Sequence, residues 1–151
     1  MIFQRINRSD PEKVFVIAKN SYNSGALANG YAVAWDFITD KDGVGVTLPL
    51  ARATNGGFAF AGVAAEAIAA GAYGLIQVYG YHSATRTRSK TGSAPGIHMG
   101  RPLALSAVGS VWCMESIQTG STHVLVRPGA FALADNSVWT SSAIAVFIKA
   151  M

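Results

Sequence analysis

Charged side chains are scarce in this 151-residue chain, at 13% of the sequence, against roughly 25% in an ordinary globular domain. Disorder is excluded because it requires high charge and low hydrophobicity, whereas 50% of these residues are hydrophobic. A folded surface with so few charges is covered either by another protein or by small polar residues, and the frequent Ser, Thr and Asn supply part of the second cover. Obligate interfaces are depleted in charge, so we expect an obligate oligomer or a subunit of a larger assembly.

Cysteine is almost absent, and the single Cys113 excludes an internal disulfide. Its neighbours, Trp112 and Met114, favour a buried apolar thiol over a reactive nucleophile. The stability of the chain must therefore come from packing or assembly, and a reducing compartment suits it.

Long apolar runs are also missing. A membrane-spanning helix needs about 18 or more consecutive apolar residues, whereas runs such as "FAFAGVAA" and "AIAVFIKAM" are interrupted or too short. We therefore expect no membrane partner. The amino-terminal "MIFQRINRSDPEK" lacks the apolar core and cleavage site of a signal peptide. Length and the absence of an evident linker predict a single domain over residues 1–151.

The net charge of +4 raises the question of nucleic-acid binding. The 12 basic residues are spread along the chain, however, and only Arg86, Arg88 and Lys90 cluster. Nucleic-acid binders usually concentrate positive charge on one face and carry a recognisable module. We expect no direct nucleic-acid partner.

Several segments predict β-strands. "KVFVIAK", from Lys13 to Lys19, is rich in β-branched and aromatic residues and indicates a buried strand. The alternative is a helix start, because Ser9 and Glu12 form a capping-box pattern around Pro11. The strand explains the run better, and it leaves an extended amino-terminal segment of about residues 1–12.

A β-hairpin is predicted next. Residues 31–39 lead into the turn "DKDG" at residues 40–43, and residues 44–48 return. Asp-Gly is a strong hairpin signal because glycine accepts positive φ without a steric clash. "ATNGG" indicates another turn, and "FAFAGV" another short strand.

The segment "GVAAEAIAAGAYGLIQVYGY", residues 62–81, combines a helix-like first half with a strand-like second half. Only eight residues separate Gly62 from Gly71, and isolated helices shorter than about 12–15 residues are marginal. We expect at most one helical turn around residues 64–67, then a glycine corner, and a strand from Leu75 to about His82.

Residues 83–101 have the composition of a long loop, or of a hairpin arm that opens with the alternating "TRTRS". Three further segments each hold a β-run bounded by Gly, Ser or Pro, and the last places a strand at the carboxyl end. The fold class predicted is therefore all-β, a small antiparallel β-barrel or β-sandwich with little or no helix.

No motif for catalysis, a cofactor or a metal is evident. The glycines at 71, 74 and 80 lack the spacing and the following helix of a dinucleotide loop. "DKDG" lacks the terminal glutamate of a calcium loop, because position 12 from Asp40 is alanine. The histidines are far apart in sequence, at 82, 98 and 123. We expect no enzyme, no cofactor and no metal site.

Two other sets of residues bear on function. Three acidic residues outside turns and the amino terminus have no obvious partnership, namely Asp36, Glu66 and Glu115. The aromatic residues are more often core or interface anchors than sugar-stacking platforms; they are Tyr22, Tyr31, Trp35, Tyr79, Tyr81, Trp112 and Trp139.

Arg86, Arg88 and Lys90 are the candidate contact residues. On an alternating strand all three lie on one face, where guanidinium groups suit carboxylates of a neighbouring protein. The alternative is a solvated loop, and the sequence leaves both open.

Four phrases follow a familiar order: "NRSDPEKVFVIAKN", "GYAVAWDFITDKDGVGVTLP", "FAGVAAEAIAAGAYGLIQVYGYH" and "GRPLALS". With the hydrophobic carboxyl-terminal strand, they resemble small virion structural proteins of tailed bacteriophages, of the capsid decoration (cement) type. The resemblance is most specific at residues 10–46 and 61–82, and it weakens across residues 84–100.

This resemblance implies a protein that binds the outer capsid surface and stabilises the shell. The expected partners are the major capsid protein and further copies of the chain, as a homotrimer, and the expected location is the virion surface after synthesis in the host bacterial cytoplasm. The alternatives are a tail, neck or baseplate β-module, or a carbohydrate-binding adhesion module.

Overall fold

The computed structural model describes residues 12–49, 59–88, 96–108, 111–116, 128–136 and 142–150. Within these ranges the fold is all-β and contains no helix, so the predicted all-β class with little or no helix is confirmed. None of the described residues therefore belongs to a helix of membrane-spanning length and hydropathy. The strands are β1 (Lys13–Asn20), β2 (Ala32–Trp35), β3 (Gly45–Thr47), β4 (Phe60–Ala64), β5 (Tyr73–Arg88), β6 (Pro102–Val108), β7 (Val111–Ser116), β8 (Ala130–Ala132) and β9 (Ser142–Lys149).

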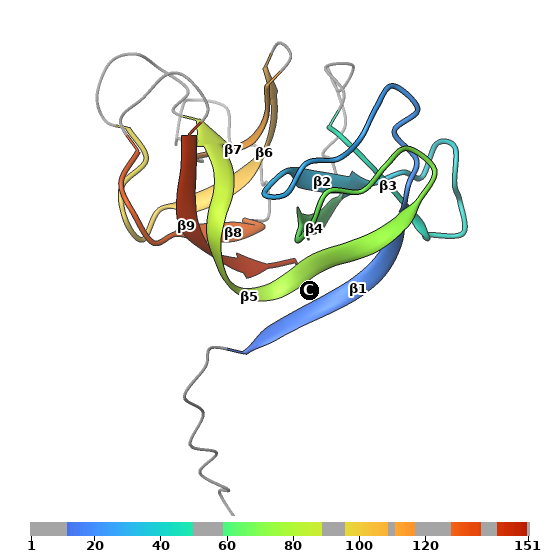
Figure 1. Ribbon diagram of the computed structural model, residues 1–151. Coiled ribbons are helices and arrows are strands. Elements are labelled where there is room, and N and C mark those ends of the chain that lie inside the picture. Colours follow the sequence, from blue (N-terminus) through green and yellow to red (C-terminus); the bar gives the residue numbers. More distant parts are fainter. Residues whose placement is uncertain are drawn as a thin grey trace, which may run out of the picture.

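Strand β5 organises the sheet because it belongs to two closed rings of strands (Figure 1). The first ring runs β1-β3-β2-β4-β5 and closes where β1 pairs with β5 along residues 73–80. The second ring runs β5-β7-β6-β8-β9 and closes where β9 pairs with β5 along residues 79–87. The pairings β1–β3 and β5–β7 are parallel, and the other pairings in the described sheet are antiparallel.

Each ring has its own hydrophobic core. The first core contains Val33, Val46 and Ile76, and the second contains Val146 and Ile148, all with no exposed surface. Burying such an aliphatic side chain stabilises the fold by about 1.5–3 kcal/mol. The rings also pack against each other: β2 and β4 belong to the first ring, but the buried Ala32 and Val63 belong to the second core, and Phe60 of β4 packs against it.

The strand β1 matches the predicted strand at residues 13–19, but the prediction that it is buried holds for one face only. Val14, Val16 and Ala18 pack into or against the first core, whereas Phe15 and Ile17 are exposed. A strand directs successive side chains to opposite faces, and only one face of β1 lies against a core.

The predicted hairpin is present as β2 and β3, with Ala34 opposite Thr47 and Trp35 opposite Val46. The first strand ends at Trp35, earlier than expected, because the backbone turns at residues 37–39. Gly43 has a φ of 75°, as the Asp-Gly signal predicts. The predicted "ATNGG" turn lies outside the described residues.

Two predictions that the sequence left open are decided by the structure. At most one helical turn was expected at residues 64–67, and none forms; the chain bends there, and Ile68 bridges to Leu27. Of the loop and the arm expected from residue 83, residues 83–88 take the extended form and continue β5 to Arg88. The strand extends because β9 pairs with residues 79–87, and because Thr85 and Thr87 are β-branched residues buried on its inner face.

Gly80 lies where the two rings meet on β5. It is opposite Lys13 of β1 and Ile148 of β9, and its φ is 99°. A Cβ at this position would collide with the backbone carbonyl oxygen of Glu12. The closure of the first ring therefore requires glycine at position 80.

We predict that Gly80→Ala destabilises the protein far more than Gly43→Ala does. Both glycines have positive φ, which costs an L-residue about 1–2 kcal/mol. Only Gly80 adds a collision with backbone, because an added Cβ at Gly43 has no neighbour within 4 Å. Urea unfolding of the two variants measures the difference, and equal losses would contradict a special role for Gly80.

Candidate interaction site

Arg86 is an exposed residue of β5 that lies over the first ring. Its guanidinium carbon is 4.8 Å from the ring centroid of Tyr31, which is cation–π geometry. Its backbone N–H donates to the carbonyl of Gly30 (2.9 Å). The backbone bond and the Tyr31 side chain thus hold the Arg86 guanidinium between the two rings of strands, and part of the Arg86 side chain is open to solvent.

The structure places two of the three predicted contact residues on one face. Arg86 and Arg88 are two residues apart in β5, so their side chains leave the same face of the strand. Arg86 is exposed and Arg88 is half-buried. Lys90 lies outside the described residues. Arg86 is therefore the most accessible member of the cluster among these residues.

Aromatic side chains extend along the outer face of the same strand. The rings of Tyr79 and Phe147 are perpendicular, with centroids 5.2 Å apart, and Tyr81 is directly opposite Phe147. All three are half-buried. Tyr22, Tyr31 and Trp35 pack against the first core. These contacts favour the anchor interpretation of the aromatic residues over a sugar-stacking platform. The side chains of Trp112 and Trp139 lie outside the described part of the chain.

The inner face of β5 carries buried polar side chains where the second ring closes. His82 Nδ1 is 3.0 Å from Thr85 Oγ1 and accepts the backbone N–H of Ala84 (3.3 Å). Farther along, Asn136 Nδ2 donates to Thr87 Oγ1 (2.9 Å). Burial lowers the pKa of His82, and the positive charge of Lys13 lowers it further. The acceptor role of Nδ1 agrees with a neutral ring.

We predict that protonation of His82 destabilises the fold. Its ordinary pKa is 6.5, and the folded pKa is lower. Between these two values the unfolded chain binds more protons, so the free energy of unfolding falls as pH drops below 6.5. In urea unfolding between about pH 7.5 and about pH 5, His82→Gln should lose much of this dependence.

The matched control is His98→Gln, which removes a histidine from the exposed surface instead of from the buried face of β5. A wild-type pH dependence in the His82→Gln variant would show that other groups cause the loss of stability.

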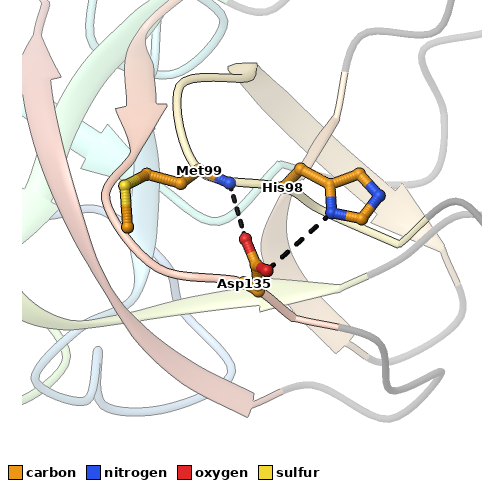
Figure 2. Close-up of polar contacts among 3 residues, drawn as sticks. All are labelled: His98, Met99 and Asp135. Carbon is orange, nitrogen blue, oxygen red and sulfur yellow. Dashed lines mark hydrogen bonds and ion pairs between the residues drawn. The ribbon is translucent and has the colours of Figure 1, made fainter.

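His98 and Asp135 approach each other on the surface, but their geometry does not suit catalysis (Figure 2). His98 Nδ1 is 3.9 Å from Asp135 Oδ2, beyond hydrogen-bond reach, and the two side chains are 54% and 70% exposed. Asp135 Oδ1 instead accepts the backbone N–H of Met99 (2.8 Å). Asp135 therefore connects two loops that also meet at the bridge between Ile97 and Asn136.

Two of the three acidic residues that the sequence left without a partner, Asp36 and Glu66, accept hydrogen bonds from nearby backbone N–H groups. Asp36 accepts the backbone N–H groups of Ile38 (3.2 Å) and Thr39 (3.1 Å), and also the Thr39 hydroxyl. Glu66 accepts the N–H of Leu75 (2.9 Å). The Glu115 side chain lies outside the described part of the molecule, as does His123. No group of three or more His, Cys, Asp or Glu side chains within the described ranges is arranged to hold a metal ion.

A second surface was missed by the sequence reasoning. Phe15 and Ile17 of β1, together with Tyr73 and Leu75 of β5, are exposed large hydrophobic residues, and Ile17 is 69% exposed. Ile17 lies directly opposite Leu75, so these side chains share the outer face of the first ring. The run "KVFVIAK" predicts a buried strand, but nothing in the sequence says which face of it is left uncovered.

Comparisons with known proteins identify no relative of this chain: no protein-family model matches it, and neither does any curated protein or solved structure. The resemblance to decoration proteins therefore rests on the sequence phrases alone.

Proposed function

We propose that this protein is a bacteriophage capsid decoration (cement) protein that binds the outer surface of the head and stabilises the shell. The observation that carries the proposal is an outer sheet face with four large exposed apolar side chains in a chain that is only 13% charged. Large exposed apolar patches mark interaction sites. The order of the sequence phrases supports a virion protein in particular.

The proposed mechanism is mass action without catalysis. A ligand that binds only the assembled shell stabilises it by about 2.7 kcal/mol per site when its concentration is 100 times Kd. The partners are the major capsid protein and further copies of this chain, as a homotrimer. Repetition of the contact over the lattice gives the shell its resistance to internal pressure.

Within this proposal, Arg86, Arg88 and Lys90 bind carboxylates of the shell. Arg86 supports this role because its guanidinium is held over Tyr31 and yet remains accessible. An arginine that is already ordered loses less conformational freedom when it binds a carboxylate.

We predict that replacing Arg86, Arg88 and Lys90 together with serine weakens attachment to empty expanded shells about tenfold, since exposed ion pairs contribute about 0.2–1 kcal/mol each. Co-sedimentation at low and high salt measures the change, which should shrink as salt screens the charges. Lys41→Ser, in the hairpin turn, is the matched control. An unchanged salt dependence in a folded triple variant would exclude these residues from the contact.

The copy number per particle tests the function itself. A decoration protein should be present in hundreds of copies in purified virions, because the contact repeats over the whole shell. A tail, neck or baseplate module should be present in far fewer copies. Quantitative mass spectrometry of the particles distinguishes these cases, and absence from mature particles would overturn every virion role.

A further inference from the structure

Strand β1 has one edge that is only partly paired. β5 lies along one side of β1, whereas β3 pairs on the other side with Lys19 and Asn20 alone. Figure 1 shows β1 on the outside of the fold beneath β5, with β3 near its carboxyl end. Among the described residues, the edge of β1 from Lys13 to Ile17 therefore faces no other strand.

The backbone groups of Phe15 and Ile17 point toward this open edge. Leu75 lies opposite Ile17, and its backbone groups bond away from β1: its N–H donates to Glu66, and its carbonyl accepts from Ala65 (both 2.9 Å). Ile17 and Leu75 are therefore a non-hydrogen-bonded antiparallel pair, in which the backbone N–H and C=O groups of both residues point away from the partner strand. The backbone groups of Ile17 thus point to the open edge, and so do those of Phe15, two residues earlier in the same strand. Lys19, two residues beyond Ile17, confirms the direction, since its N–H donates to Val44 on that side (2.9 Å).

The side chains along this edge form a simple pattern. Phe15 and Ile17 are exposed and apolar, and the exposed Lys13 and Lys19 lie at the two ends of the same face. Neither lysine forms an ion pair with any acidic residue in the described part of the chain. The edge thus offers backbone hydrogen bonds, two apolar contacts and two positive charges, about 20 Å apart.

We propose that this edge of β1 binds an extended segment of a partner protein by strand addition. The segment pairs along residues 13–17, carries apolar side chains opposite Phe15 and Ile17, and has a carboxylate at each end, within reach of the exposed side chains of Lys13 and Lys19. Backbone hydrogen bonds supply affinity in this mode, and alternate side chains supply specificity. The inference shares Phe15 and Ile17 with the apolar face that supports the proposed function, but it requires no capsid partner, so its test can succeed even if the protein is absent from virions.

A second copy of the same edge is a poorer occupant. Because β3 already pairs with Lys19, two copies can pair antiparallel only along residues 13–17, about a two-fold axis at Phe15. That register places Lys13 opposite Ile17 of the other copy and diagonal to its Lys19, twice, which brings like charges within reach of each other. Lysines on an edge strand oppose self-pairing in this way. The two lysines therefore disfavour self-association and favour an acidic partner.

The test uses the full-length protein and two blocked heptapeptides that differ only at their ends. The sequence Glu-Thr-Val-Thr-Val-Thr-Glu matches the proposed partner, and Lys-Thr-Val-Thr-Val-Thr-Lys is its control. NMR titration of the labelled protein gives both the affinity and the residues that respond. We expect the acidic peptide to bind about tenfold more tightly, with the largest amide shifts at Phe15 and Ile17.

Two variants make the result decisive. Lys13→Glu with Lys19→Glu should reverse the preference, so that the basic peptide binds more tightly. Ile17→Pro should abolish binding without removing an internal hydrogen bond, because the Ile17 N–H points to the open edge; Ile38→Ala, at an exposed loop residue, should leave binding unchanged. Should Ile17→Pro not fold, the charge reversal alone decides. Equal binding of the two peptides, no binding, or amide shifts away from β1 would overturn the proposal.

Discussion

The fold depends on one strand that closes two rings. β5 pairs with β1 and β4 through its first half, and with β9 and β7 through its second half. A single strand serves both rings only if β1 and β9 both approach it closely where its pairing changes from one to the other. Gly80 lies at that position and permits the close approach because it has no Cβ. The two cores depend on the same backbone, so a defect at this point affects both rings.

The scarce charges and the exposed apolar residues describe the same property of the molecule. A chain this poor in charge has few charged side chains for the solvent-facing positions of its sheet, and the outer side of β1 and β5 presents apolar side chains to solvent. The few lysines and arginines lie at informative places: Lys13 and Lys19 end an open strand edge, and Arg86 lies over Tyr31 where the rings meet. Both surfaces suit a protein whose partners cover part of it.

Buried polar groups specify the second ring. His82, Thr85, Thr87 and Asn136 have little or no exposed surface, and each has a hydrogen-bond partner. Such groups are costly to bury unless paired, so they favour one arrangement of β5 against its neighbours. The sequence does not show these contacts, because Thr87 and Asn136 are 49 residues apart, and because the burial of His82 and Thr85 depends on the pairing of β5 with the distant β9.

The sequence determined the local features, and the tertiary structure decided how they combine. Strand periodicity at residues 13–19 and 75–82, the Asp-Gly turn and the low charge were legible because each depends on neighbouring residues only. The extension of β5 to Arg88, the two rings and the exposure of Phe15 and Ile17 were not, because they depend on which distant strand pairs with which. The predicted arginine cluster could be placed on one face by alternation, but its position over Tyr31 required the fold. Alternation separates the two faces of a strand, and only pairing between distant strands determines which face is covered.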